Sequence, residues 1–325
     1  MIHIAKSHRF YQCLTDSSIS PYWQELLVYM GQHTCYQQGS ELLEKLLGTS
    51  MNAMQLQRLT TTYGQRVGPL LEQPTAAQRV APEEVVYAQV DGGMLLTREQ
   101  GWQEAKLGRV YCSEACYTSA SQRGAVHQSE YVAHLGSHQD FEAKMSVLTD
   151  KYEALAERLV FISDGAPWIA NWVSAAYPQA TQILDYYHAK EHLGQFAVAY
   201  FADKRQASAW TQQVSEELLE QGVEAAIASI QRLIKSRSAV EKQRINLLNY
   251  YQSNAYRMNY PLYLARGWCI GSGAIEAAHR TVSQQRLKLS GQRWTRHGAQ
   301  CVLNLRVLRM SNRWHELQQL IKQAA

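Results

Sequence analysis

Three acidic residues, Asp91, Asp164 and Glu276, have the types and positions from which a catalytic metal site could be built. Asp91 follows the apolar run 85–90, Asp164 follows the run 159–163, and each aspartate precedes a glycine. Short apolar runs are typical of strands buried on both faces, and a carboxylate at the carboxyl end of such a strand lies at the rim of the sheet, where ligand sites form. Since Asp-Gly is also a common turn pair, two ordinary turns are the alternative interpretation.

Glu276 begins a predicted helix after a glycine-rich segment, with Ser272 or Gly273 as the N-cap. One face of this helix carries Glu276, His279, Arg280 and Ser283, beside an apolar stripe of Ile275, Ala278 and Val282. Three converging carboxylates without a cationic partner repel one another unless divalent cations bind, and oxygen ligands favour Mg²⁺ or Mn²⁺. Two such ions about 4 Å apart support an in-line displacement at phosphorus. A carboxylate that simply faces the helix dipole is the alternative for Glu276.

The first part of the chain is predicted to be helical. Helices over 40–47 and 52–71, joined by a glycine-containing turn, form the pattern of a helix-turn-helix. The second of these helices carries Gln55 and Arg58 on its polar side and could enter a major groove. A packed helical hairpin fits the same pattern. Residues 73–82 contain two prolines and no periodicity, which predicts a linker.

The elements that position the three acids follow this linker. The expected order of elements, β-β-β-α-β-α-β, indicates an α/β core with a mixed sheet. Strands are predicted over 85–90, 104–112, 126–135, 159–163 and 182–184, with helices over 141–155 and from about Pro167. Strand signals then disappear, and helices are predicted over 188–201, 204–221, 223–235 and 239–258. These helices form an all-helical insertion before Glu276.

The charge distribution indicates a polyanionic partner. The chain has 325 residues and a net charge of +4, and its length suggests two or three domains. Residues 266–325 carry ten Lys or Arg and two Asp or Glu, a net of +8, which leaves −4 for the remainder. Basic charge gathered in one segment favours nucleic acid, although a solvated helical face has the same composition.

The cysteines and the apolar runs bear on the compartment. The six cysteines show no dense disulfide framework, which suits a reducing compartment. A zinc site from Cys112, Cys116 and His127 has weak spacing, and free thiols are expected. No apolar run approaches the ~18 residues of a membrane helix, and the first residues lack a secretory signal. A cytoplasmic protein without a membrane partner is expected.

Five segments together carry a family resemblance. They are VDGGMLL, WQEAKLGRVY, FISDGAPWI, LDYYHAKEHL and GSGAIEAAHRTVSQQRLKLSGQRW. In order and spacing they resemble the DDE transposases of bacterial insertion sequences, most closely the ISKra-type group, which is related to Mutator-like elements. The resemblance covers about 85–314, and the N-terminal helices are more loosely similar. Larger relatives often carry an N-terminal zinc-type cysteine cluster, and nothing before Pro82 has such ligand spacing.

The resemblance implies a ribonuclease-H-like fold, with Asp91 on the first strand, Asp164 on the fourth and Glu276 on a late helix. The implied organisation is an N-terminal helical region with a candidate helix-turn-helix for DNA (1–82), the first part of the core (83–187), a helical insertion (188–266), and the last core helix with a basic tail (267–325). The three acids would hold two Mg²⁺ or Mn²⁺ ions, with Asp185, His188, His279 and Arg280 near them.

The basic segment after Glu276 supplies candidate DNA contacts, because cations and amides can bind phosphates and an indole can stack on an unpaired base. Stacking and core packing are both open for Trp294. The residues expected to contact DNA are Gln55, Arg58, Lys106, Trp168, Arg286, Lys288, Arg293, Trp294 and Arg296.

The expected function is therefore cleavage at transposon ends followed by strand transfer into target DNA, by a homodimer assembled on DNA at the bacterial nucleoid. Two alternatives remain open. One is a nuclease or junction resolvase on the same fold, and the other is a transposase-derived protein that binds DNA without catalysis.

Overall fold

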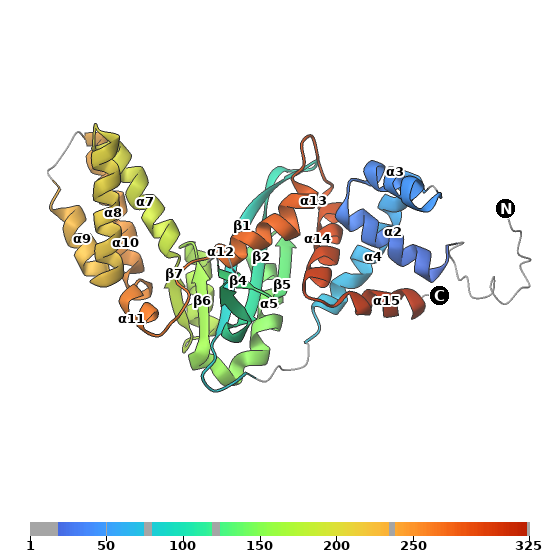
Figure 1. Ribbon diagram of the computed structural model, residues 1–325, viewed down its shortest axis with the longest axis horizontal. Coiled ribbons are helices and arrows are strands. Elements are labelled where there is room, and N and C mark those ends of the chain that lie inside the picture. The colour runs from blue at the N-terminus through green and yellow to red at the C-terminus, as the bar shows by residue number, and fades with distance from the viewer. Residues whose placement is uncertain (1–18, 50, 75–79, 119–123, 234–237, 324–325) are drawn as a thin grey trace, which may run out of the picture.

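A mixed five-stranded sheet with helices on both faces occupies the centre of the molecule (Figure 1). The computed structural model describes residues 19–49, 51–74, 80–118, 124–233 and 238–323. One group of helices lies beside β7 at one end of the sheet, and a second group lies beyond α14 at the other end. The expected α/β class with a mixed sheet is confirmed.

The sheet has the strand order β5-β2-β1-β6-β7. Its strands are β1 (Val86–Thr97), β2 (Gly101–Cys112), β5 (Glu130–Leu135), β6 (Leu159–Ser163) and β7 (Thr181–Leu184). β1, β2 and β5 are antiparallel neighbours, whereas β6 and β7 run parallel to β1. A short turn of 3₁₀-helix, η1 (Ser113–Ala115), leads to a separate two-stranded ribbon, β3 (Cys116–Thr118) and β4 (Gly124–Val126).

The first strand continues well beyond Asp91, so the prediction that it ends there in an Asp-Gly turn is wrong. Pairing with β6 stops at Val90, but antiparallel pairing with β2 continues to Thr97 opposite Gly101. Gly93 therefore lies within the strand, where a Cβ atom would come within 3.0 Å of the His279 ring. Gly92, the glycine predicted to turn the chain after Asp91, is paired with Lys106 inside the ladder and makes no turn, and Gly93 allows close packing against His279.

Alternate side chains of β1 pack into two different layers, because successive residues of a strand face opposite sides. Val86, Ala88 and Val90 contact the layer formed by α5 (His138–Thr149), η2 (Asp150–Arg158, a 3₁₀-helix) and α6 (Pro167–Ala176). The helix predicted over 141–155 thus ends at Thr149 and continues as 3₁₀-helix. The opposite face is covered by α12 (Gly273–Ala278), the π-helical turn η4 (His279–Gln284), α13 (Gln285–Leu287) and α14 (Arg296–Met310).

Side chains of α14 occupy the free backbone groups of the edge strand β5. Gln300 accepts a hydrogen bond from the Leu135 amide at 2.8 Å and donates one to the Ala133 carbonyl at 3.1 Å. Arg296 donates to the Leu135 carbonyl at 3.4 Å. An uncovered edge strand is a template for unwanted pairing with another strand. The side chains of α14 cover this edge of the sheet, and the same hydrogen bonds fix the position of α14.

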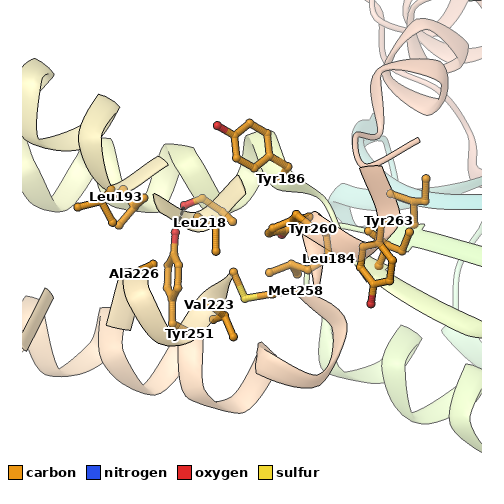
Figure 2. Close-up of a cluster of buried hydrophobic side chains, with 14 of the residues drawn as sticks. Leu184, Tyr186, Leu193, Leu218, Val223, Ala226, Tyr251, Met258, Tyr260 and Tyr263 are labelled. Atoms are coloured by element: carbon orange, nitrogen blue, oxygen red, sulfur yellow. Dashed lines mark hydrogen bonds between the residues drawn. The ribbon is translucent and has the colours of Figure 1, made fainter. Parts of the chain in front are cut away.

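The helices predicted between the second and third acids are present. The four predicted helices are α7 (Tyr186–Tyr200), α8 (Lys204–Glu220), α9 (Val223–Gln231) and α10 (Ser238–Asn254). The last of them continues as η3 (Ala255–Arg257), and α11 (Tyr260–Ala265), which was not predicted, follows. The last two residues of the helix predicted over 223–235 lie outside the described residues. Figure 2 shows the hydrophobic core that these helices share, in which Tyr251, Met258 and Tyr260 lie between the helices. The Tyr260 hydroxyl donates to the Leu184 carbonyl at 2.9 Å, so this core continues onto β7.

The N-terminal helices pack on α14. They are α2 (Pro21–His33), α3 (Tyr36–Leu47) and α4 (Ala53–Leu71), with the C-terminal α15 (Trp314–Gln323) beside them. α3 ends at Gly48, which has a φ of +64°, and Asn52 caps α4 by accepting from the Gln55 amide at 2.8 Å. The two predicted helices and their glycine turn are therefore confirmed. Residues 75–79 of the predicted linker lie outside the described residues. Across the described ranges, no helix is long and apolar enough to cross a membrane.

Candidate active site

Asp91 and Asp164 are brought side by side by the register of two parallel strands. Val90 on β1 is paired with Ser163 on β6, and each aspartate is the next residue along its strand. β6 ends there, and Gly165, with a φ of +102°, turns the chain toward α6. This positive φ confirms the predicted turn at the second aspartate.

Each of these carboxylates uses one oxygen in a local hydrogen bond. Asp91 Oδ1 accepts from the Gly92 amide at 2.7 Å, and Asp164 Oδ1 accepts from the Ala166 amide at 3.0 Å. Burial is the main cause that raises the pKa of Asp91, and the negative charge of Asp164 raises it further. The neighbouring aspartates therefore repel each other, which a bound cation would relieve.

Glu276 and Asp91 line the same pocket, which has a volume of about 410 Å³. Its other lining residues are Gly92, Gly93, Met94, His279, Arg280, Ser283, Gln284 and Lys288. The face predicted for the Glu276 helix is thus the face that borders the pocket, and Ile275, Ala278 and Val282 are buried against the sheet as predicted. Arg280 and Lys288 are exposed, so their positive charges lie at the pocket and in solvent.

Two buried polar residues hold the start of α12 against the sheet. Gln89 on β1 is paired with Arg109 on β2, and both side chains are buried. Gln89 accepts from the Ile275 amide at 2.8 Å and donates to the Gly271 carbonyl at 3.2 Å. Arg109 donates to the Ala274 carbonyl at 2.6 Å. Sequence reasoning missed both, although a glutamine inside the apolar run 85–90 was a visible signal.

His279 lies directly against Asp91. Its Nε2 atom is 3.4 Å from Asp91 Oδ2, and only 7% of the side chain is exposed. The imidazole lowers the pKa of Asp91, but burial outweighs it. Nε2 has no hydrogen-bond partner within the described part of the chain. The structure therefore brings this predicted supporting residue to the first carboxylate.

Asp185 and His188 occupy the start of α7. Asp185 is buried, accepts from the Tyr187 amide at 2.9 Å and from the Ser272 hydroxyl, and so connects α7 to the segment before Glu276. Ser272 is the N-cap residue of α12 by position, but its hydroxyl is used on Asp185 and not on the helix. His188 is half-buried and is one of the groups that lower the pKa of Asp91.

Tyr250 of α10 is a further residue that sequence reasoning missed. A Cβ atom on Gly165 would lie 3.3 Å from its hydroxyl oxygen, so the ring covers the turn after Asp164. Burial raises the pKa of Tyr250, and the charges of Asp164 and Asp185 raise it further against the opposing effect of Arg257. Its position in a helical segment far along the chain gave no local signal.

Three residues expected to contact DNA are instead packed inside the protein. Arg286 is 1% exposed, donates to the Gly31 carbonyl at 3.0 Å, and lies 4.7 Å from the ring centroids of both Tyr36 and Trp294. Trp294 is 8% exposed and donates from its indole to the Leu287 carbonyl at 3.1 Å. These two side chains join the N-terminal helices to the core, and their assignment as DNA contacts is corrected.

Lys106 is the third buried residue. It is 5% exposed, and its ammonium group donates to the Gly136 carbonyl at 2.9 Å and pairs with Glu104 at 2.6 Å. It also lies 5.9 Å from the ring of Trp168, which is partly buried against the core. The candidates that remain exposed or partly exposed are Gln55, Arg58, Trp168, Lys288, Arg293 and Arg296.

Five cysteines in the described ranges, Cys35, Cys112, Cys116, Cys269 and Cys301, are free thiols, as expected. Within those same ranges, no three His, Cys, Asp or Glu side chains are grouped closely enough to hold a metal ion. No protein-family model matches this chain, and no curated protein matches it.

Proposed function

We propose that this chain is a DDE-type DNA transposase that cleaves transposon ends and joins the freed 3′ ends to target DNA. The observation that carries the proposal is the pairing of Val90 with Ser163, which places Asp91 and Asp164 next to each other. Glu276 lines the same pocket as Asp91. Fold-level likeness alone does not define a function, and this arrangement of acids is a specific feature of the site.

The donor set fits hard divalent cations. Within the described part of the chain, Asp91 and Asp164 each have one oxygen without a backbone hydrogen bond, and no Lys or Arg there forms an ion pair with either carboxylate. Carboxylate oxygens suit Mg²⁺ or Mn²⁺. Asp91, Asp164 and Glu276 would hold two such ions, which when bound neutralise charge at the phosphate and activate water or a 3′-hydroxyl.

Other residues of the pocket bind and orient the substrate in this proposal. Arg280 and Lys288 present cations that suit the phosphates flanking the scissile bond. His279 packs on Gly93 and limits the orientations open to the Asp91 carboxylate. Gln89 and Arg109 hold the start of the Glu276 helix, so the third acid approaches from a fixed direction.

The wider organisation is part of the same proposal. The core is ribonuclease-H-like, because the sheet is mixed and the acids lie on the first and fourth of its five strands and on a late helix. Residues 188–266 are a helical insertion in this core, and 1–82 is a region for DNA recognition through exposed residues such as Arg58. Two chains pair on DNA because two transposon ends are joined in one reaction.

A cleavage assay on DNA that carries the inverted repeats flanking the gene tests the proposal. Asp164→Asn should abolish magnesium-dependent cleavage and strand transfer while DNA binding is retained. Asp203→Asn is the matched control, because Asp203 caps α8 away from the sheet and asparagine caps equally well. A wild-type protein that cuts but gives no strand-transfer product is a nuclease or resolvase. One that binds these ends without cutting is a non-catalytic derivative.

A further inference from the structure

The hydroxyl group of Tyr250 is buried beside the candidate site. Among the described residues it has no hydrogen-bond partner. Buried polar side chains are nearly always paired, so an exception next to a candidate site calls for an explanation, and a role at that site is one such explanation. The hydroxyl lies against Gly165, the residue that follows Asp164, and a Cβ atom there would be 3.3 Å away.

The chemistry at this position favours donation to a carboxylate. A tyrosine hydroxyl, with an ordinary pKa of about 10, keeps its proton at neutral pH and can donate it. Asp164 uses Oδ1 to accept from the Ala166 amide, and no backbone amide of the described residues donates to its other oxygen. A neutral hydroxyl and an anionic oxygen form a strong, charge-assisted hydrogen bond.

The ring that carries this hydroxyl is held by two helices. Its centroid is 4.3 Å from that of His192, and the His192 ring is 4.9 Å from the His188 ring, both on α7. Tyr250 itself belongs to α10. The helical region between the second and third acids therefore fixes where the hydroxyl points.

We propose that Tyr250 is a positioning residue of the metal site, whose hydroxyl donates to the free oxygen of Asp164 and holds that carboxylate in its metal-binding orientation. This inference rests on the proposed function. It gives the helical region 188–266 a direct part in the site, because α10 supplies a group that the sheet and α12 do not provide.

Binding of Mn²⁺ alone, measured by electron paramagnetic resonance of the free ion, tests the inference in the full chain. Tyr250→Phe keeps the ring and removes the hydroxyl. Because loss of an outer hydrogen bond to a metal ligand typically weakens metal binding about 10–100-fold, a loss of about tenfold is expected. The melting temperature should stay within a few degrees of the wild type, since the deleted hydroxyl has no hydrogen-bond partner among the described residues.

Tyr251→Phe is the matched control. The Tyr251 hydroxyl also belongs to α10, but it is paired with the Ala189 carbonyl at 2.9 Å inside the helical core. This variant should melt at a lower temperature and bind Mn²⁺ as the wild type does.

In Tyr250→Phe, the magnesium concentration for half-maximal cleavage should rise while the rate at saturating magnesium is largely kept.

The outcomes separate the inference from the function on which it rests. The proposed function fails if the wild type does not bind Mn²⁺, or if Asp91→Asn leaves that binding unchanged. If the wild type binds Mn²⁺ through Asp91 and Tyr250→Phe binds equally well, the positioning role is overturned. A Tyr250→Phe protein that melts early and keeps its Mn²⁺ affinity, as expected for Tyr251→Phe, assigns the hydroxyl to stability alone.

Discussion

Replacement of Trp294 by alanine should destabilise the protein strongly. The indole is 8% exposed, its N–H donates to the Leu287 carbonyl at 3.1 Å, and the Arg286 guanidinium lies 4.7 Å from its ring. Truncation of a buried tryptophan costs about 3–5 kcal/mol, and the abandoned Leu287 carbonyl adds about 1 kcal/mol. The total, about 4–6 kcal/mol, is a large share of the ~5–15 kcal/mol by which a folded domain is stable.

Urea denaturation followed by circular dichroism measures this loss, with Trp294→Phe as the control. Phenylalanine keeps an aromatic ring beside Arg286 and loses only the indole hydrogen bond and some volume, so a cost of about 1–2 kcal/mol is expected. Binding to intact duplex and to frayed DNA ends should fall by the same factor in Trp294→Ala. Core packing of Trp294 is refuted if the free energy of unfolding of Trp294→Ala lies within about 0.5 kcal/mol of the wild-type value, as for substitutions at exposed positions, and if the variant loses affinity for frayed ends alone.

Three other perturbations test the site and its surroundings. Burial raises the pKa of Asp91 above its ordinary value of 3.8, so the metal-free folded state binds this proton more tightly than the unfolded state and loses stability as the pH rises above that value. In EDTA, Asp91→Asn should therefore have a higher melting temperature than the wild type at about pH 7, where the wild-type carboxylate is charged, and the same melting temperature at about pH 3. If the variant and the wild type melt at the same temperature at both pH values, burial of the Asp91 charge does not destabilise the protein. Lys288→Ala and Arg293→Ala should each lower the salt dependence of DNA binding by about 0.9 in logarithmic slope; an unchanged slope in filter-binding titrations would show that these exposed cations touch no phosphate. Gln89→Leu removes three hydrogen bonds, to Ile275, Gly271 and Tyr111. Calorimetry should therefore show a free energy of unfolding that is lower by about 3 kcal/mol, and the cleavage rate should fall as well. A variant as stable as the wild type would mean that α12 is held by apolar packing alone.

The sequence determined the elements whose signals are local. Apolar runs located β6 and β7, the proline and glycine around Asp164 located the turn into α6, and helical periodicity located α7 to α10. The face of the Glu276 helix that borders the pocket also followed from periodicity, since residues three and four positions apart share one side of a helix. Such patterns depend on neighbours within one or two turns of the chain, which the sequence contains in full.

Tertiary structure decided the roles that depend on partners far along the chain. β1 continues past Asp91 because β2 pairs with it to Thr97, although Asp-Gly is locally a turn sequence. Arg286 was predicted to be an exposed DNA contact and core packing was open for Trp294, and the N-terminal helices and α14 enclose both side chains. Tyr250 reaches Gly165 from 85 residues later in the chain. A side chain's type sets which contacts it can make, whereas burial and hydrogen-bond partners depend on which distant surface packs against it.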